Sequence, residues 1–279
     1  MTAPACLRAE IRGFPYLPRT RVMGVVNVTP DSFSDGGQHA RTEEAIAHGR
    51  ALLAQGADLL DVGGESTRPG AGRVDADEEL RRVLPVVEAL APLGPVSIDT
   101  TRADVARAAV AAGAVMVNDV SGGLADPAML AVIAELGPAY VVMHSRGPSA
   151  DMSSRASYDD VTADVIAELT ARVDAALLAG VQSDQLVVDP GLGFAKEPDH
   201  SWRLLQDLTR MAALGRPLLV GASRKGFLAG AVGEGPPAGR DGATAAVTAF
   251  AAAAGVWAVR VHEVAASAAA VRVLARLQQ

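Results

Sequence analysis

The chain has 279 residues, of which 49% are hydrophobic and only 4% aromatic, and its formal net charge is −7. This length allows one large domain with a core of Ala, Val, Leu and Ile, and we predict a single domain because no Pro-, Gly- or Ser-rich linker divides the chain. The acidic charge argues against a nucleic-acid-binding protein, whose phosphate contacts need a basic surface.

Cys6 is the only cysteine, so an internal disulfide is excluded, as is usual for proteins of a reducing compartment. The sequence starts without the charged and apolar segments of a signal peptide. No stretch reaches the roughly 18 consecutive apolar residues of a membrane helix. We therefore expect a cytoplasmic protein that has neither nucleic acid nor membrane as a partner.

Short apolar segments alternate with helix-like segments along the chain. The eight apolar segments, which we predict to be strands, are residues 22–28, 59–62, 96–98, 115–117, 139–143, 186–188, 218–220 and 257–261. The other segments place apolar residues three and four positions apart, as amphipathic helices do. They cover residues 42–55, 77–91, 102–112, 127–136, 159–179, 199–214, 244–254 and 264–277.

The alternation of strands and helices predicts a parallel sheet, and eight strands are the number that closes a TIM (β/α)8 barrel. We therefore predict an α/β fold in which an N-terminal extension, residues 1–21, precedes a barrel of residues 22–279. An open doubly wound sheet is the alternative, because strand spacing alone does not establish closure. The extension either plugs the barrel or lies on its surface, and residues 233–241 form an exposed loop.

Polar residues follow the predicted strands, at the ends that meet on the C-terminal face of a barrel, where active sites lie. They are Asn27, Asp61, Asp99, Asn118, Asp119, His144, Asp189, Ser223, Arg224, Lys225 and His262. Polar side chains at buried strand ends are costly unless they are paired or functional. Their recurrence is the main indication of a binding site.

Two acids and an amide in this set suit a ring edge that is rich in N–H groups. A carboxylate of Asp99 or Asp189 accepts two parallel hydrogen bonds, and Asn118 offers both a donor and an acceptor. A guanidine-like or pterin edge would be recognised in this way. The competing interpretation for Asp99 is that it, or Thr100, caps the following helix.

The basic residues indicate an anion. Lys225 stands at a predicted helix start, Arg260 and His262 lie on one side of the last strand, and Arg68 belongs to a Gly-rich loop. Together these residues suit a diphosphate. For Lys225 and its neighbour Arg224, a solvated basic turn is the alternative interpretation.

The loop that opens at Asn27 is long and polar, and is either a surface turn or a lid that closes on substrate. Asn27 also offers an amide oxygen of the kind that Mg²⁺ accepts. The sequence has no Walker loop, no strand-to-helix G-x-G-x-x-G and no H-E-x-x-H, and zinc is not indicated. Ser66 and Ser223 have no histidine partner that is evident in the sequence, so a hydrolytic triad is not supported.

The ordered motifs resemble those of the dihydropteroate synthase family. The resemblance runs from about residue 22 to the C-terminus and rests on residues 27–36 (NVTPDSFSDG), 61–70 (DVGGESTRPG), 97–100 (SIDT), 118–123 (NDVSGG), 189–196 (DPGLGFAK), 221–225 (GASRK) and 260–262 (RVH). It implies a TIM barrel that condenses a dihydropterin-CH₂-diphosphate with 4-aminobenzoate to 7,8-dihydropteroate and diphosphate, with Mg²⁺. It also implies a homodimer and a target of sulfonamides, which mimic aminobenzoate.

The resemblance assigns roles to the matching residues. Those that would hold the pterin are Asp99, Asn118, Met143, Asp189 and Lys225. Those that would hold the diphosphate are Asn27, which also binds Mg²⁺, Arg260 and His262. Those that would form the aminobenzoate pocket are Phe33, Thr67, Arg68, Pro69 and Gly226. Asp35, which would face the developing cation, completes a catalytic set with Arg68 and Lys225.

Gly226 is a departure, because the family often has serine there to bind the aminobenzoate carboxylate. A backbone amide at a helix start would bind that carboxylate instead. Two rival functions remain open. A pterin-binding methyltransferase of the methyltetrahydrofolate–corrinoid type would need no diphosphate site, and a silent paralogue would bind pterins without turnover.

Overall fold

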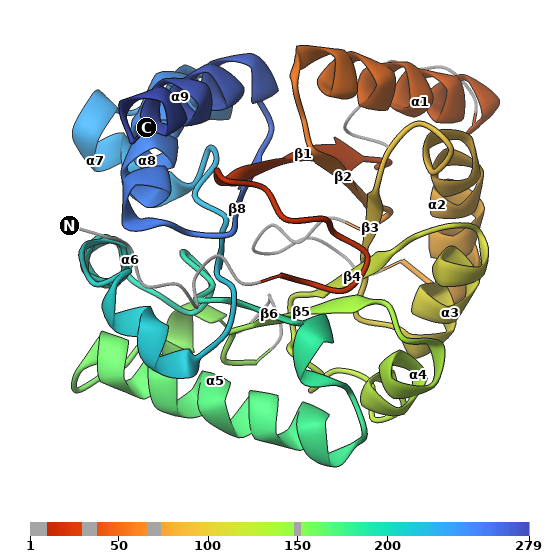
Figure 1. The fold of residues 1–279 in the computed structure, drawn as a ribbon, viewed down its shortest axis with the longest axis horizontal. Coiled ribbons are helices and arrows are strands. Elements are labelled where there is room, and N and C mark those ends of the chain that lie inside the picture. The colour runs from red at the N-terminus through yellow and green to blue at the C-terminus, as the bar shows by residue number, and fades with distance from the viewer. Residues whose placement is uncertain (1–9, 30–37, 66–73, 148–151, 279) are drawn as a thin grey trace.

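The computed structural model describes residues 10–29, 38–65, 74–147 and 152–278. Within these residues, eight parallel strands form one sheet, and Figure 1 shows helices around it. The strands are β1 (Arg21–Asn27), β2 (Leu59–Gly63), β3 (Val96–Asp99), β4 (Met116–Asp119), β5 (Ala139–Met143), β6 (Leu186–Asp189), β7 (Leu219–Val220) and β8 (Ala258–Val261).

The helices follow the strands in alternation, as the sequence predicts. Among the described residues they are α1 (Gln38–Gln55), α2 (Ala76–Leu90), α3 (Ala103–Ala111), α4 (Met129–Leu136), α5 (Val161–Leu178), α6 (Pro198–Gln206), α7 (Ala229–Val232), α8 (Asp241–Ala254) and α9 (Val264–Leu277). Short 3₁₀ turns connect some of them, including Arg210–Leu214, Gly226–Leu228 and Pro237–Arg240.

The sheet closes into a barrel. Its strand order is β6-β5-β4-β3-β2-β1-β8-β7, so that only β6 and β7 remain to be joined. A parallel bridge between Val188 and Leu218 joins them, and Val188 N donates a hydrogen bond of 2.9 Å to the carbonyl of Pro217. The predicted TIM barrel is therefore confirmed, and the open doubly wound sheet is excluded.

Each strand alternates between two apolar layers, as the two-residue period of a strand requires. Leu60 and Val62 of β2 belong to the core between sheet and helices. Leu59, one position before Leu60, belongs to a second cluster inside the barrel, together with Met23, Met116, Val141, Val187, Leu219 and Ala258. The polar residues that follow on this inward face lie nearer the C-terminal ends of the strands.

Residues before β1 close the opposite end of the barrel. Ile11 and Phe14 are buried and belong to the interior cluster. The Phe14 ring packs edge-on against Trp257, with 5.4 Å between ring centroids, and the guanidinium of Arg21 lies 5.0 Å from the Trp257 ring centroid. The described part of the N-terminal extension thus plugs the barrel rather than lying on its surface.

One predicted helix is interrupted. The spacing predicts a single helix over residues 199–214, whereas α6 ends at Gln206 and a 3₁₀ turn begins at Arg210. The cause is Asp207, whose carboxylate accepts hydrogen bonds from Thr162 of α5 at 2.8 Å and from Arg210 at 2.9 Å. These bonds fix the chain in a turn where a helix would otherwise continue.

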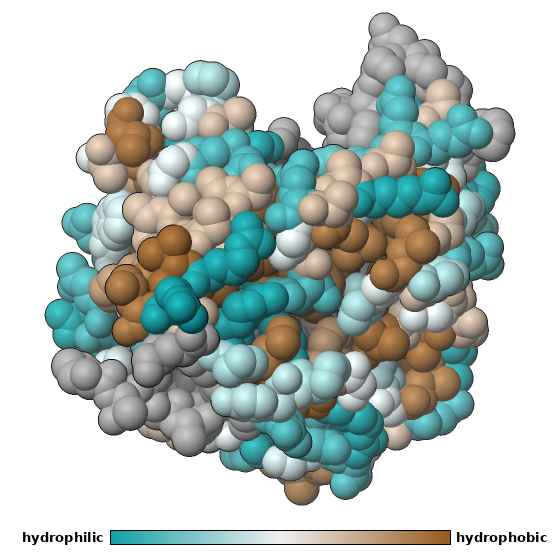
Figure 2. Space-filling view, turned by 45° about the horizontal axis from the view of Figure 1, so that its top comes forward, coloured by the Kyte–Doolittle hydropathy of each residue, from teal (hydrophilic) through white to brown (hydrophobic). Residues whose placement is uncertain are grey.

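The surface agrees with two further expectations. Residues 231–239 are exposed, as predicted for the loop of residues 233–241, although a 3₁₀ turn lies within it. Figure 2 shows polar and apolar residues interspersed on the face that it displays. None of the helices that the structure describes is both long and apolar enough to cross a bilayer.

The plug generates a stability prediction. We expect Phe14→Ala to lower the free energy of unfolding by about 3–5 kcal/mol, because it leaves a cavity beside Trp257. Tyr16→Ala is the matched control, since Tyr16 is 60% exposed; its effect should stay within about 0.5 kcal/mol. Urea denaturation measures both changes, and equal effects of the two variants would contradict a plug.

Candidate active site

The inward face of the barrel changes from apolar to polar near its C-terminal end. Asp61 follows Leu59 by two residues on β2, and Arg260 follows Ala258 by two on β8, so each pair shares the inward face. In the same way, Asn118 on β4, Asp99 on β3 and Asp189 on β6 each lie two residues after Met116, Ser97 and Val187 of the same strand. The fold therefore brings together polar residues that the sequence separates by up to 199 positions.

Arg260 lies at the centre of this polar layer. Its Nε donates to Asp61 Oδ2 at 2.6 Å, and its Nη2 donates to Asp99 Oδ2 at 2.8 Å. Asn118 Nδ2 donates to the same Asp61 oxygen at 2.9 Å. Asp61 is fully buried, so its charge depends on these donors for compensation.

Burial shifts the pKa values of the charged groups in this layer. Burial raises the pKa of Asp99 to about 7, although Arg260 opposes the rise and the neighbouring Asp61 adds to it. Burial lowers the pKa of the Arg260 guanidinium, but Asp61 and Asp99 outweigh that effect and raise it. One permanent cation thus faces two carboxylates, and the pKa of Asp99 lies near neutral pH.

The interpretation of Asp99 as a helix cap is wrong. The first helical amide of α3, that of Ala103, donates to Asp126 Oδ2 at 2.8 Å. Thr100 Oγ1 accepts from the amide of Arg102 at 3.2 Å and so supports the helix start. The Asp99 side chain faces Arg260 instead.

A second pair of charges, Asp189 and Lys225, lies beside Arg260 at the barrel mouth. Asp189 Oδ1 accepts from the amide of Gly191 at 2.7 Å. The Lys225 ammonium donates to the carbonyl of Leu192 and lies 4.7 Å from the ring centroid of Phe194. Burial raises the pKa of Asp189 and lowers that of Lys225 to about 8, and each group's charge opposes the shift of the other.

Met143 and Gly191 shape the space beside Asp189. Met143 is the register partner of Asp189 on the neighbouring strand, and only 4% of it is exposed. Gly191 has φ +66°, and a Cβ there would lie 1.9 Å from the carbonyl oxygen of His144. Only glycine fits this position, because any side chain would push the loop after β6 off the barrel.

His262 has a partner that the sequence does not reveal. Ser223 Oγ lies 3.0 Å from His262 Nδ1 and accepts from the His262 amide at 3.1 Å. Because its oxygen accepts from the amide, the hydroxyl proton is available to Nδ1, which leaves the imidazole proton on Nε2. Ser223 thus has a histidine partner that is not evident in the sequence, and this serine orients the imidazole.

Asn27 and Gly226 lie at the rim of the barrel. Asn27 is the last residue of β1 and pairs in register with Gly63. Gly226 begins a three-residue 3₁₀ turn that leads into the four-residue helix α7. A Cβ at Gly226 would meet no atom within 4 Å. Since the helix here is so short, its dipole contributes less to anion binding than the sequence analysis expects.

Five of the predicted site residues lie outside the described part of the chain. They are Phe33, Asp35, Thr67, Arg68 and Pro69. The described residues on either side of 66–73 are bound by one side chain, because Arg102 donates to Glu65 Oε2 at 2.9 Å and to the carbonyl of Val74. Arg102 also pairs with the buried carboxylate of Glu79.

Two strand-end residues that the sequence groups with the site are structural. Asp119 accepts hydrogen bonds from Ser121, from the amide of Gly123 and from the Tyr140 hydroxyl. His144 is fully buried behind Met143 and contacts Glu168 and Lys196. Arg224 belongs with them, since its guanidinium pairs with Asp241 at 2.7 Å.

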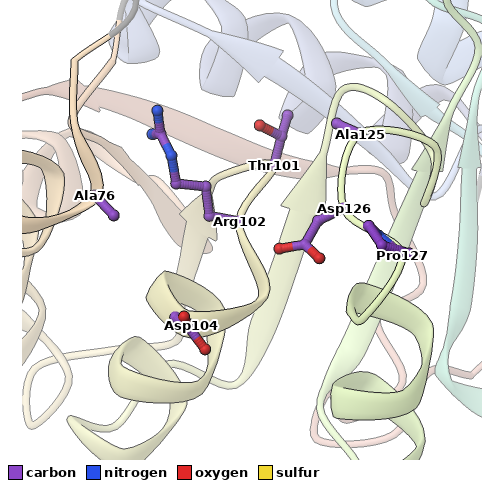
Figure 3. Close-up of a pocket in the computed structure, with 7 residues that line it drawn as sticks. All are labelled: Ala76, Thr101, Arg102, Asp104, Ala125, Asp126 and Pro127. Atoms are coloured by element: carbon purple, nitrogen blue, oxygen red, sulfur yellow. The ribbon is translucent and has the colours of Figure 1, made fainter.

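A hollow of about 300 Å³ lies away from the polar layer. It is lined by Ala76, Thr101, Arg102, Asp104, Ala125, Asp126 and Pro127. Figure 3 shows Arg102 and Asp126 on its two sides. Arg102 is paired with glutamates and Asp126 caps α3, so these two charged groups at the hollow serve structural bonds.

Lys196 is a residue that sequence reasoning misses. It lies in the loop after β6, where its residue type and position alone indicate no role. A compositional signal could have found it, because Lys196 and Lys225 are the only two lysines among 25 basic residues.

The pairing of Arg260 with two buried carboxylates generates a prediction. We expect Arg260→Met to lower the free energy of unfolding by about 3–5 kcal/mol at neutral pH, because it leaves two buried carboxylates unpaired. The loss should shrink as pH falls towards about 4, since without Arg260 the folded state binds protons more tightly than the unfolded chain.

Arg12→Met is the matched control for Arg260→Met. Arg12 pairs with Asp184 at 2.8 Å, but both side chains are about half exposed, and such surface pairs contribute within about 1 kcal/mol. Denaturation curves at several pH values measure both variants. A loss in Arg260→Met that is no larger than in the control, or that does not depend on pH, would contradict the buried network.

The chain matches known pterin-binding proteins over most of its length. The family model "Pterin binding enzyme" covers residues 23–262. A dihydropteroate synthase of Mycobacterium leprae is 55% identical over 265 residues, which is 92% of this chain and 93% of that protein. These matches include every described residue of the polar layer.

Solved structures agree in fold. Xanthomonas albilineans dihydropteroate synthase with 4-aminobenzoic acid has a TM-score of 0.88 and 47% identity, with 93% of each chain covered. Yersinia pestis dihydropteroate synthase in a sulfonamide drug complex has a TM-score of 0.90 and 37% identity, with 97% of this chain and 98% of that chain covered. The chain therefore belongs to the dihydropteroate synthase family of pterin-binding enzymes.

Proposed function

We propose that the polar layer at the barrel mouth carries out the dihydropteroate synthase reaction of folate biosynthesis. In this reaction a (7,8-dihydropterin-6-yl)methyl diphosphate condenses with 4-aminobenzoate to 7,8-dihydropteroate, and diphosphate leaves. The observation that carries the proposal is the convergence of Asp99, Asn118, Asp189 and Lys225 with Arg260 on one inward face. It offers carboxylates, an amide and two cations within one barrel mouth.

The pterin binds between Asp99, Asn118 and Asp189, over Met143. Asp61 holds the NH₂ group of Asn118, so that the amide oxygen is left to accept an N–H of the pterin. The carboxylate of Asp189 accepts from the aminopyrimidinone edge, and Lys225 donates to an acceptor on the ring. Met143 packs on the ring face with its polarisable thioether.

The diphosphate binds to Arg260, His262 and Asn27. Arg260 uses its Nε and one Nη2 proton for carboxylates, and a guanidinium has five N–H groups, so three remain for phosphate oxygens. Ser223 directs the Nε2–H of His262 away from its own hydroxyl and towards the ligand side.

Asn27 fits Mg²⁺ as a single oxygen ligand. Among the described residues, no three or more His, Cys, Asp or Glu side chains gather to hold a metal. A magnesium ion that takes most of its ligands from diphosphate and water needs no such cage. The ion, when bound, neutralises charge on the leaving diphosphate.

The reaction needs a stabilised leaving group more than a base. The electron-rich pterin stabilises a CH₂ cation as diphosphate departs, and the arylamine of 4-aminobenzoate is already nucleophilic. Arg260 and His262 therefore act on the leaving group, where the negative charge develops.

The second substrate occupies a pocket formed largely by loops. The motif match supports Phe33, Thr67, Arg68, Pro69 and Gly226 for 4-aminobenzoate, with Asp35 facing the cation. Asp35, Arg68 and Lys225 then form the catalytic set. Sulfonamides, as mimics of aminobenzoate, compete for this pocket.

We further propose a cytoplasmic homodimer. Exposed apolar residues on three neighbouring helices support a second copy as the partner: Val232 of α7, Phe250 of α8, and Val273 and Leu277 of α9. Figure 1 shows these helices together at the upper left. A single cysteine fits a reducing compartment.

A mass-resolved assay of the purified chain tests the reaction. Dihydropteroate should form only when the pterin diphosphate, 4-aminobenzoate and Mg²⁺ are all present, with diphosphate as the second product. Bound pterin without product would favour the silent paralogue. Methyl transfer from methyltetrahydrofolate would favour the methyltransferase, which has no use for Arg260 and His262 as a diphosphate site.

Lys225 generates a prediction on substrate affinity. We expect Lys225→Ala to weaken pterin diphosphate binding by about 1.5–3 kcal/mol, or roughly ten- to 150-fold in KM, through loss of one charge-assisted contact. Because its pKa is about 8, Lys225 loses its charge as pH rises through 8, and kcat/KM for the pterin substrate should fall there.

Steady-state kinetics over pH check both effects. The fall above pH 8 should be absent in Lys225→Ala. Arg203→Ala is the control, because Arg203 lies on α6 and is half exposed; it should keep the wild-type KM and pH profile. An unchanged KM and profile in Lys225→Ala would remove this residue from the pterin site.

A further inference from the structure

The chain has 23 arginines but only two lysines, Lys196 and Lys225. Both lysines are partly buried: Lys196 belongs to the loop that follows β6, residues 190–197, and Lys225 donates to the carbonyl of Leu192 in it. Arginine keeps its charge in every protein environment, whereas lysine is a compact amine that gives up its proton when buried. Lysine thus stands only at two positions, which lie close together in the fold. The proposed reaction uses only Lys225.

Lys196 joins the loop to β5 and α5. Its Nζ lies 2.9 Å from His144 Nδ1 and donates to the carbonyl of Phe194 at 3.0 Å. On the other side of the imidazole, His144 Nε2 lies 3.0 Å from Glu168 Oε2 of α5. The Nε2–H therefore donates to the glutamate, and Nδ1 is left to accept from the lysine.

The loop itself has an unusual backbone. Gly191, Gly193 and Ala195 have φ of +66°, +74° and +50°. Ala195 carries a side chain, so its left-handed conformation persists only where neighbouring bonds enforce it. Those bonds are on both sides: the Tyr158 hydroxyl donates to the carbonyl of Ala195 at 2.8 Å, and Lys196 holds the carbonyl of Phe194.

Lys225 contacts this loop through two of its residues. The carbonyl of Leu192 accepts from the Lys225 ammonium, and the ring of Phe194 lies 4.7 Å from it. A shift of the loop would move both groups. We propose that Lys196 is a positioning residue, which ties the loop after β6 to His144 and thereby fixes Lys225 in the pterin site; the pterin role of Lys225 rests on the proposed function.

The surroundings of Lys196 explain why an amine stands here. No carboxylate pairs with Lys196 among the described residues. Burial lowers the pKa of Lys196 well below its ordinary value, and the charge of Lys225 lowers it further. The other charged groups that face it are Asp189 and Glu168, which favour its protonation, and Arg172, which opposes it. An arginine would place a permanent second cation beside Lys225.

The kinetic test compares Lys196→Met with Gln185→Met. Gln185 is a buried polar residue that also anchors a loop, through a 2.7 Å hydrogen bond to the carbonyl of Pro138, but it precedes β6 at the opposite end of the barrel. We expect Lys196→Met to raise KM for the pterin diphosphate roughly tenfold or more, because small displacements at a site are costly. KM for 4-aminobenzoate should change much less.

The control defines a purely structural effect. Gln185→Met should lower thermal stability and leave both KM values at the wild-type level. If Lys196→Met behaves like Gln185→Met in both properties, the proposal is overturned.

Lysine labelled with ¹³C at Cε gives a test that needs no turnover. The protein should show two signals, assigned by Lys225→Ala. In the wild type we expect the Lys196 signal to titrate well below the ordinary value of a lysine amine. In Lys196→Met we expect the Lys225 signal to move and its titration midpoint to rise from about 8, because the loosened loop admits water.

The two NMR results decide between outcomes. A wild-type Lys196 that titrates near the ordinary value of 10.5 would overturn the proposal, and so would an unmoved Lys225 signal in Lys196→Met. The titration of Lys196 in the wild type tests the proposal even if Lys196→Met fails to fold. If both NMR results are as expected but the wild type forms no dihydropteroate, the proposed function fails while the link between the two lysines stands.

Discussion

The ion pairs of Arg260 are the interaction on which the barrel mouth depends. They join β8 to β2 and β3 on the inward face, where no backbone hydrogen bond can reach across. A buried network of this kind seldom adds net stability compared with an apolar filling, because desolvation of the charges offsets their attraction. Its value lies in holding a guanidinium, two carboxylates and an amide in fixed orientation before any ligand arrives, which is the condition for electrostatic catalysis.

Much of this layer follows from the two-residue period of a strand. Leu59 and Asp61, or Ala258 and Arg260, can be assigned to one face from the sequence alone, and the barrel then brings their ends together. The partners cannot be assigned in this way. The sequence places Asp61 only among the polar strand ends of a binding site, whereas the structure makes it the buried partner of Arg260 and Asn118. That pairing depends on which strands face each other across the barrel, and local sequence carries no such information.

Residue type alone also fails to separate functional from structural polar groups. Asp119 and His144 end strands just as Asp99 and Asp189 do. The carboxylate oxygens of Asp119 nevertheless accept hydrogen bonds from the loop after β4, and His144 is fully buried. The helix expected over residues 199–214 fails for a related reason, because the carboxylate of Asp207 accepts a long-range hydrogen bond from Thr162 of α5 that outweighs helix propensity. In each case, hydrogen bonds or burial that the residue type does not reveal decide the outcome.

The contrast between arginine and lysine suggests how the site divides its tasks. Diphosphate carries charge at every pH of interest and suits Arg260, whose own charge is permanent. A pterin ring is a neutral hydrogen-bonding partner that needs a directed donor more than a fixed charge. Lys225, with a pKa near 8, stays largely protonated at neutral pH and gives the ring such a charge-assisted donor. The pKa of Lys196 is lowered well below its ordinary value, so this amine anchors the loop with less repulsion of the lysine that the loop supports.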